Sequence, residues 1–549
     1  MEHSPFQISS VLPLVSPWTI LTSIIVGGII SKALLSLANS STFSKNKKRK
    51  DDELEDIPMA PGAIPFLGHA IWYQQDPPKF IHETCEALGP IFRINLAGKS
   101  MIVIGRLCPA LYQVTTLAES VLSTKHAVAA AGFEQTLGLL NVHSGTDTVK
   151  RIVKDTLYTP NAYEKELPNL YASIRTAIAS EIQMATLVAS HENHPQTYHI
   201  PDFLYTMRRV MMRVIIDRMI GPTFLQCDGA LEVLSNFMTF QDQLEDATAK
   251  AVILPRWLSL PLFLWPVQRR RQVLQTQIRK ILSTMVRDID TNDASPLGWW
   301  LQQHIDSKRY SLEEIAELVV GLWFAAHKNP SIGATQAYLF LWERATQHDR
   351  QACYKEAQRL AEQSTASMKT STYTETLQSC TALHKVCIET LRLTAHTIGA
   401  IRIAKEDIRL NETKYTIRKG ETLALSHIGI SLDDAIWSRT RNHSNGDNSN
   451  DEDSNERKNR QNDKSASDFD TSRPIEWYQD DYQFSVFSQG IHKCPGQRLA
   501  VTMMQLALAT LLADYTISWD QTKIPSVSFE RATLAQRHGP VAVTIKPKG

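Results

Sequence analysis

Residues 487–496 read FSQGIHKCPG, and an apolar run with helical spacing, AVTMMQLALATLL, follows at residues 500–512. The stretch is therefore a glycine-containing loop that presents one cysteine, Cys494, and then enters a helix. At the start of a helix, the backbone N–H groups and the positive end of the dipole lower the pKa of a thiol. Gly490 permits a tight turn and a close approach to a flat ligand, and Gly496 leaves space where the face of that ligand could lie.

The other residues of this loop point to an identity. His492 can donate to an anionic group, and Pro495 suits an early helical position, where no N–H is needed. With Phe487, the pattern resembles the haem-binding loop of cytochrome P450 enzymes, F-G-x-G-x-H/R-x-C-x-G, with Ser488 in place of the first glycine. The resemblance implies that Cys494 supplies the thiolate ligand to the iron of haem b. The alternative interpretation is a buried structural thiol, the commonest state of a lone cysteine.

A second motif lies upstream, where residues 389–392 read ETLR inside a helical segment, residues 382–396. Glu389 and Arg392 are three residues apart, so they share one face of the helix and can pair. Strand-like segments and then the cysteine loop follow, in the order typical of the family. The resemblance implies a structural salt bridge near the haem, with Arg473 as its third member, although the Pro-Glu that usually precedes this arginine is missing.

The same resemblance indicates residues that bind the haem propionates. Arg402 lies in the strand-like segment after the ETLR helix, and its fixed fork of donors and permanent charge suit a carboxylate. The alternative is an ordinary exposed arginine. The helix that usually provides the second propionate ligand carries W-x-x-x-R, but residues 144–154 contain no tryptophan. Lys150 or Arg151 is the candidate there.

The oxygen-activating helix departs from the family pattern, A/G-G-x-D/E-T-T. The candidate stretch, residues 321–341, reads GLWFAAHKNPSIGATQAYLFL. Its F-A-A places Ala325 and Ala326 at the small positions over the haem. Lys328 then falls where the acid belongs, and Asn329 where the alcohol belongs. The acid–alcohol pair delivers protons through water, whereas an amide binds water but cannot relay a proton as a hydroxyl does.

Pro330 follows and removes a backbone hydrogen bond, so it predicts a widened or kinked helix. Three interpretations remain open. The helix supports monooxygenation through Asn329, ordered water or a substrate hydroxyl. Alternatively, the enzyme rearranges, dehydrates or couples its substrate without the usual oxygen activation. In the third, the alignment is shifted by one residue and brings His327 or Ser331 into the site.

The composition excludes several classes of protein. The 549 residues include 58 Lys and Arg and 57 Asp and Glu, so the net charge of +1 gives no electrostatic support for a nucleic-acid partner. The seven cysteines are scattered without C-x-x-C spacing, which argues against a disulfide framework or a zinc site. Length alone suggests several domains, but no internal repeat divides the chain.

Helical periodicity dominates the body of the chain. Residues 201–220, 266–290 and 311–326 have apolar residues at threes and fours, and the last segment begins with a capping box, Ser311 with Glu314. Strand-like segments are few: residues 90–96, 101–106, 401–404, 415–425 and 541–547. We therefore expect a mainly α fold with small β-sheets.

The N-terminal region predicts a membrane anchor. Residues 11–31 carry no charge and are long enough to cross the ~30 Å hydrocarbon core as a helix. A basic cluster follows at residues 45–50, and the positive-inside bias then places residues 1–10 in the lumen and the body in the cytosol. A cleaved signal peptide and a buried helix are the alternatives. The linker, residues 32–70, ends in a proline-rich stretch that indicates a semi-rigid hinge.

One stretch of the body differs from the rest. Residues 440–468 contain one alanine and no larger apolar residue, which predicts a disordered surface insertion. The remainder of residues 71–549 is expected to form one large catalytic domain. The resemblance implies the cytochrome P450 fold, a single mainly α domain around one haem, after the N-terminal transmembrane helix.

The resemblance also implies a function. Family members insert one oxygen atom from O2 into a lipophilic substrate, with electrons from NADPH that arrive through a membrane-bound reductase. Lys493 and Arg498 flank the ligand loop and are candidates for contact with an acidic reductase; cytochrome b5 is a further candidate partner. We expect a single-pass protein of the endoplasmic reticulum membrane with a cytosolic catalytic domain. It is similar to filamentous-fungal members that tailor secondary metabolites such as terpenoids, alkaloids or polyketides. A non-enzymatic haem sensor is the alternative from another class.

Overall fold

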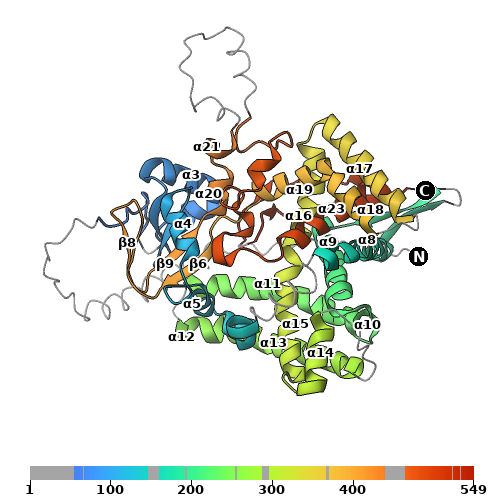
Figure 1. Ribbon diagram of the computed structural model, residues 1–549, viewed down its shortest axis with the longest axis horizontal. Coiled ribbons are helices and arrows are strands. Elements are labelled where there is room, and N and C mark those ends of the chain that lie inside the picture. The colour runs from blue at the N-terminus through green and yellow to red at the C-terminus, as the bar shows by residue number, and fades with distance from the viewer. Residues whose placement is uncertain are drawn as a thin grey trace, which may run out of the picture.

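The computed structural model shows a body made mainly of helices, with small sheets at its edges (Figure 1). This confirms the predicted fold class. The structure describes residues 55–65, 67–145, 160–191, 194–253, 256–286, 296–365, 370–438, 464–521, 523–531 and 533–548.

The α-helices in chain order are α2 (Ala70–Gln75), α3 (Pro77–Leu88), α4 (Pro109–Thr116), α5 (Thr124–Ala130), α6 (Phe133–Thr136), α8 (Pro160–Gln183), α9 (Phe203–Ile215), α10 (Pro222–Gln226), α11 (Ala230–Ile253), α12 (Arg256–Ser259), α13 (Trp265–Met285), α14 (Pro296–Ser307), α15 (Leu312–Ala326), α16 (Lys328–Glu343), α17 (Gln347–Thr365), α18 (Thr370–Ser379), α19 (Thr381–Leu393), α20 (His427–Ser431), α21 (Asp434–Trp437) and α23 (Gln497–Asp514). Short π- and 3₁₀-helical turns are η1 (Asn141–Gly145), η3 (Ile216–Ile220), η4 (Leu260–Leu264), η7 (Ile475–Tyr478), η8 (Ser485–Phe487) and η9 (Gly490–His492).

A five-stranded sheet has the order β1-β2-β9-β6-β3. Its strands are β1 (Ile91–Leu96), β2 (Lys99–Ile104), β3 (Leu122–Ser123), β6 (Gly399–Ala404) and β9 (Thr422–Leu425). The pair β2–β9 is parallel and the other pairs are antiparallel. Four of these strands, β1, β2, β6 and β9, fall in segments where the sequence predicts strands. The sheet therefore joins two predicted groups of strands that are far apart in the chain.

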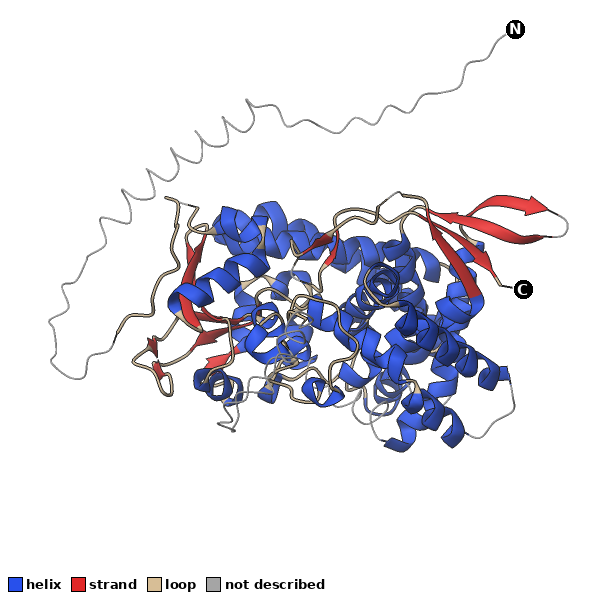
Figure 2. Ribbon diagram, turned by 90° about the horizontal axis from the view of Figure 1, so that it is seen from above, coloured by secondary structure: helices blue, strands red, loops and turns tan. Residues whose placement is uncertain are grey.

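A second sheet, at the opposite end of the helical body, has the order β10-β13-β5-β4 (Figure 2). Its strands are β4 (Thr186–His191), β5 (His194–Ile200), β10 (Tyr515–Trp519) and β13 (Val543–Pro547). Only β13 lies in a segment predicted as a strand. The hairpin β4–β5 is completed by pairing with β13, a contact that local sequence cannot reveal. The remaining described strands form two two-stranded sheets: β7 (Ile408–Arg409) with β8 (Thr416–Ile417), and β11 (Val527–Ser528) with β12 (Gln536–Arg537).

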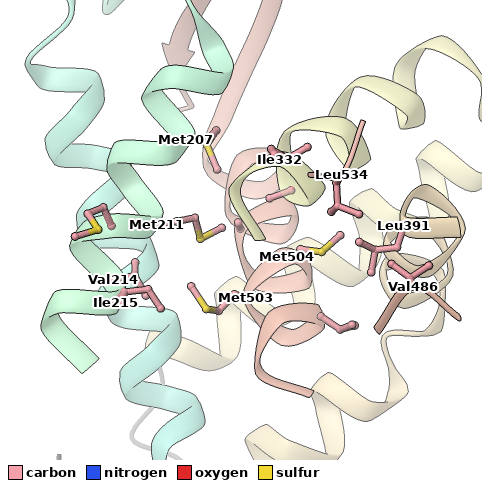
Figure 3. Packing of buried hydrophobic residues seen from close by; sticks show 14 of the residues in the cluster. Met207, Met211, Val214, Ile215, Ile332, Leu391, Val486, Met503, Met504 and Leu534 are labelled. Atoms are coloured by element: carbon pink, nitrogen blue, oxygen red, sulfur yellow. The ribbon is translucent and has the colours of Figure 1, made fainter. Parts of the chain in front are cut away.

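Helices α16 and α23 form the centre of the body. Both are buried along most of their length, as expected for helices without a polar face. Gly333 of α16 allows a very close contact, because a Cβ atom there would lie 2.6 Å from the sulfur of Met504 in α23. Figure 3 shows Met207, Met211 and Met503 in the space between α9 and α23.

The predicted oxygen-activating helix is interrupted. Helix α15 begins with the predicted capping box, in which Ser311 and Glu314 bond reciprocally. It ends at Ala326, and α16 begins at Lys328 after a break at His327. Since proline has no N–H to donate to the preceding turn, Pro330 explains the break. The kink predicted from the sequence is confirmed.

Several predicted segments lie outside the described residues: 1–10, the anchor 11–31, most of the linker, and Lys150 with Arg151. Among the described helices, none is both long and apolar enough to cross a membrane.

The end of the predicted hinge is described, and it pairs with β1. The N–H of Ala60 donates to the carbonyl of Arg93 over 2.8 Å, and the N–H of Arg93 donates to Pro58 over 2.7 Å. Ile57 and Ala60 are buried. This proline-rich stretch is therefore part of the folded body rather than a spacer in front of it.

Candidate active site

Cys494 lies in a loop between η9 and helix α23. Its backbone N–H donates to the carbonyl of Phe487 over 2.8 Å, and this bond closes the loop. Gly496 is the N-cap residue of the 18-residue helix α23, so the thiol lies just before the start of a long helix. The sequence suggested that Pro495 lies in the first helical turn. In the structure it precedes the N-cap residue and lies outside the helix. The loop thus presents an exposed cysteine where a helix dipole stabilises a thiolate.

The backbone of the loop explains its glycine positions. Gly490 has φ 62°, and a Cβ atom there would lie 2.2 Å from the carbonyl oxygen of Thr115 in α4. The close approach that requires this glycine is therefore to the backbone of α4, whereas the sequence suggested a flat ligand. Ser488 replaces the family's first glycine with φ 61° and ψ 177°, a region used almost only by glycine. It stores strain of about 1–3 kcal/mol.

Glu389 and Arg392 lie on a buried face of α19. Arg392 donates through Nε and Nη2 to the two carboxylate oxygens of Glu389, each over 2.8 Å. Arg473 donates to the same carboxylate from the segment before the cysteine loop. All three side chains are fully buried. The fold thus brings the three predicted residues into one ion cluster.

Two residues that sequence reasoning missed complete this cluster. The hydroxyl of Tyr478 donates to Glu389 over 2.6 Å, and the backbone N–H of Asp470 donates over 2.9 Å. Burial acts to raise the pKa of Glu389, but Arg392, Arg473 and the Tyr478 hydrogen bond outweigh it and hold that pKa below its usual value. The carboxylate is therefore charged, and it ties the segment before the cysteine loop to α19.

The same cluster fixes the end of the predicted disordered insertion. Arg392 donates to the carbonyl of Ala466 over 2.5 Å, and Arg473 donates to the carbonyl of Ser465 over 2.8 Å. Ala466 is fully buried. Residues 464–468, predicted as part of the insertion, thus belong to the folded body; the rest of the insertion lies outside the described residues.

Arg402 lies on β6 opposite Leu423 of β9 and is only 1% exposed. None of its three guanidinium nitrogens has a hydrogen-bond partner in the described part of the chain. Burial lowers the pKa of Arg402 to about 10, and the carboxylate of Glu119 opposes this shift. The alternative of an ordinary exposed arginine is therefore wrong. A buried, charged guanidinium calls for an anion.

His492, predicted to donate to an anionic group, faces the start of α5. Its Nε2 lies 3.3 Å from the hydroxyl of Thr124 and 3.7 Å from the carboxylate of Glu119. Glu119 also accepts from the hydroxyl of Ser123 over 2.6 Å and from the N–H of Lys125 over 2.7 Å. Sequence reasoning missed these residues because Thr124 is 368 residues from the histidine.

Other buried polar atoms of this region also have no hydrogen-bond partner among the described residues. They are the Ser488 hydroxyl, both amide atoms of Gln489, and Nδ1 of His427. Buried polar groups in folded proteins are nearly always satisfied. Together with Arg402, this set fits a polar ligand that carries acidic groups.

Ala325 and Ala326 form the last turn of α15, directly before the break at His327. Neither alanine is fully buried. Asn329 is in the first turn of α16, and its Oδ1 accepts from the backbone N–H of Leu534 over 3.4 Å. The amide is therefore tied to the C-terminal segment.

Lys328 stands where the family has an acid, but its amine is paired inside the protein. It bonds to Asp242 of α11 over 3.0 Å and to Glu245 of the same helix, and it is 3% exposed. Asp242 also accepts from Arg208 of α9 over 3.0 Å. A cation on α16 thus stands at the position of the family's acid, and its carboxylate partners lie on α11.

A shift of the alignment by one residue would place His327 or Ser331 in the site. His327 is fully buried, its Nδ1 lies 3.0 Å from the carbonyl of Trp323, and burial lowers its pKa to about 3. The hydroxyl of Ser331 donates to the carbonyl of His327 over 2.5 Å. Both side chains therefore bond to the backbone of their own helical stretch.

Comparison with known proteins agrees with this geometry. The sequence pattern of the family described as Cytochrome P450 matches residues 58–545. Lanosterol 14-alpha demethylase of Mus musculus is 23% identical over 496 residues, which cover 85% of this chain and 83% of the relative. The enzyme of the same name from Eremothecium gossypii is 22% identical over 422 residues, 73% of this chain and 71% of the relative. The family carries haem with a cysteine thiolate ligand and usually receives electrons from NADPH through a reductase. Because the match spans nearly all of the described chain, the protein belongs to the cytochrome P450 family and is a haem-dependent monooxygenase.

Proposed function

We propose that Cys494 is the thiolate ligand of the haem iron, and that the enzyme oxygenates a lipophilic substrate with O2 and electrons from NADPH. The observation that carries this proposal is the loop itself, because it holds Cys494 at the start of α23. All seven cysteines are described, and only Cys494 is exposed. Burial raises the pKa of the thiol at the others, for example to about 12 at Cys85. Those thiols are poor metal ligands at neutral pH.

The residues present fit a haem. Arg402, buried and without a hydrogen-bond partner in the described chain, would bind a propionate. His492 would donate to the other carboxylate or keep its contact with Glu119. When bound, haem supplies the iron at which O2 is activated for insertion into a C–H bond. Ala325 and Ala326 leave space beside it, and the Glu389–Arg392–Arg473 cluster holds the cysteine loop in place.

Proton delivery depends on water or on the substrate in this proposal. Lys328 is engaged by Asp242 and Glu245, and Asn329 offers an amide in place of a hydroxyl. The same observation favours a second candidate function, in which the enzyme rearranges, dehydrates or couples its substrate. Isotopically labelled O2 distinguishes the two, since only a monooxygenase places one labelled oxygen atom in the product.

A membrane location at the endoplasmic reticulum, with residues 11–31 as anchor, is part of the proposal. Trp257 and Trp265 are 67% and 49% exposed on α12 and α13, and Leu262 between them is also exposed. Tryptophan is favoured at membrane–water interfaces. The similar demethylases are named for lanosterol, an apolar terpenoid, which supports a lipophilic, terpenoid-like substrate. A secondary metabolite of this kind is the substrate that we propose.

The reductase is proposed to bind near the cysteine loop, and cytochrome b5 is a second candidate for this face. A cavity of about 1030 Å³ reaches Cys494, and Lys385, Lys493 and Arg498 are among its lining residues. Basic side chains favour an acidic partner. Lys493 is already paired with Asp481 over 2.7 Å, so Lys385 and Arg498 supply more of the positive field.

Spectroscopy of the reduced, carbon-monoxide-bound protein tests the ligand. We expect the red-shifted absorption band of a haem-thiolate protein in the wild type and its loss in Cys494→Ala. Cys227→Ala is the matched control, because that thiol is also partly exposed but lies outside the cysteine loop. An unchanged band in Cys494→Ala, or no such band in the wild type, contradicts the proposal.

A further inference from the structure

We propose that His427 is a second residue, beside Arg402, that binds a carboxylate of the haem and holds the haem in the site. The inference rests on the proposed haem ligation and deepens it. No sequence pattern pointed to this histidine. Both side chains are buried, and both carry polar atoms without a hydrogen-bond partner in the described chain.

His427 begins α20, two residues after the end of β9, and its ring lies against β6. A Cβ atom at Gly399 would be 3.4 Å from Cδ2 and 3.6 Å from Nε2 of the imidazole. The glycine therefore makes room for the ring beside the strand that carries Arg402. A register shift between Gly399 and Arg402 marks a β-bulge, which interrupts the alternation of faces along β6. The His427 ring at Gly399 and the side chain of Arg402, three residues further along β6, can therefore face the same site.

The two side chains share one buried, electropositive environment. His427 is 3% exposed and Arg402 1%. Burial lowers the pKa of His427 to about 3, and His396 and Arg402 add to this effect. The imidazole is therefore neutral and has one N–H to donate. Neither Nδ1 of His427 nor any guanidinium nitrogen of Arg402 has a hydrogen-bond partner in the described chain. A single carboxylate can accept from both groups.

His427 is held in place through its ring and through the backbone around it. The rings of His396 and His427 are 6.3 Å apart between centroids and inclined by 68°, and the N–H of Ile428 donates to the carbonyl of His396 over 2.9 Å. The hydroxyl of Ser485, in the turn before the cysteine loop, donates to the carbonyl of His427 over 3.5 Å. His427 thus links the strand that carries Arg402 to the loop that carries Cys494.

Haem transfer to excess apomyoglobin measures how firmly the full-length, haem-loaded protein holds its cofactor. His427→Phe keeps a ring for packing but removes the donor. We expect haem loss to become about tenfold faster or more, the effect of one hydrogen bond to a charged group. In the double variant His427→Phe/Arg402→Leu, the rate of haem loss should increase by less than the product of the two single increases, because both residues bind one carboxylate.

His69→Phe is the matched control. His69 is also buried, but its Nε2 lies 2.9 Å from the carbonyl of Ala60 and its Nδ1 accepts from the N–H of Asn95 over 2.9 Å. His69→Phe removes these two hydrogen bonds, so it should lower the thermal stability without accelerating haem transfer from the folded protein.

Haem loss at the wild-type rate from folded His427→Phe would overturn the proposal and leave the histidine as a packing residue. If His427→Phe does not fold, His427→Gln, which keeps an N–H donor, decides the matter. It should hold haem better than His427→Ala, and equal loss from both contradicts the proposal. A wrong haem-thiolate assignment is recognised separately, because the wild type would then lack the red-shifted band, which is recorded before haem transfer is measured.

Discussion

Replacement of Glu389 by glutamine tests the ion cluster that supports the cysteine loop. The side chain is nearly isosteric, so packing is kept and only the charge and two acceptor positions change. Arg392 and Arg473 are fully buried against this one carboxylate. The cluster therefore contains two cations and one anion. In Glu389→Gln, the two guanidinium groups stay buried with one uncharged amide oxygen and backbone carbonyls as partners, and the new amide hydrogens face the arginine donors.

The magnitude follows from these contacts. Loss of one partner from a buried ion pair costs about 3–5 kcal/mol, a large part of the about 5–15 kcal/mol that stabilises a typical domain. Tyr478→Phe removes only one donor to the charged carboxylate and should cost about 1.5–3 kcal/mol. Glu389→Gln should therefore be the more harmful substitution.

The pH dependence has a definite sign. The pKa of Glu389 is lowered from its usual 4.5 because the arginine charges and Tyr478 outweigh burial. Its contribution to stability is thus complete above the unfolded pKa and is lost as the pH falls through the lowered folded value. Between about pH 5 and 8 the difference in stability between wild type and Glu389→Gln should stay constant as far as this group is concerned.

The assay is the yield of haem-thiolate protein per total chain, followed by thermal unfolding of the variants that can be purified. We expect little or no assembled Glu389→Gln and a measurably lower Tm for Tyr478→Phe. Assembly of Glu389→Gln with the wild-type Tm, or a lower stability of Tyr478→Phe than of Glu389→Gln, would refute the predicted role of the carboxylate.

Three further outcomes can be measured by thermal unfolding of the purified protein. Ser488→Gly should raise the Tm, because it relieves strain of about 1–3 kcal/mol at a positive φ; a lower Tm would show that the serine is satisfied in its place. Lys328→Met should lower the Tm by breaking a buried ion pair, whereas Lys79→Met, which removes an exposed pair, should leave it unchanged. Gly490→Ala should be much less stable than Gly420→Ala, since both have positive φ but only Gly490 faces a backbone oxygen at 2.2 Å, and equal effects would contradict the proposed close approach.

The cysteine loop and the ETLR pair could be found in the sequence because their chemistry is local. A loop that leads into a helix and a pair three residues apart are visible as spacing, and their order along the chain carried the family resemblance. The break in the oxygen-activating helix was predictable for the same reason, since Pro330 acts on its own helix.

Partners that come from distant parts of the chain could not be found in this way. Lys328 occupied the acid's position in the sequence, yet its partners Asp242 and Glu245 lie on α11, more than 80 residues away. The glycine at position 490 was expected to approach a ligand, but it approaches α4. In each case the residue type was recognised correctly and its neighbour was not.

The sequence by itself determined the family, the mainly helical class, the cysteine that leads into α23 and the pairing of Glu389 with Arg392. Only the tertiary structure decided which buried charges are compensated. Arg473 and Tyr478 converge on Glu389. Arg402 comes from β6 and His427 from the start of α20, and neither the guanidinium group nor Nδ1 of the imidazole has a hydrogen-bond partner among the described residues. The physical reason is that burial and compensation depend on distances between segments, and side chains at β6, α20 and the cysteine loop become neighbours only when the sheet and helices have packed.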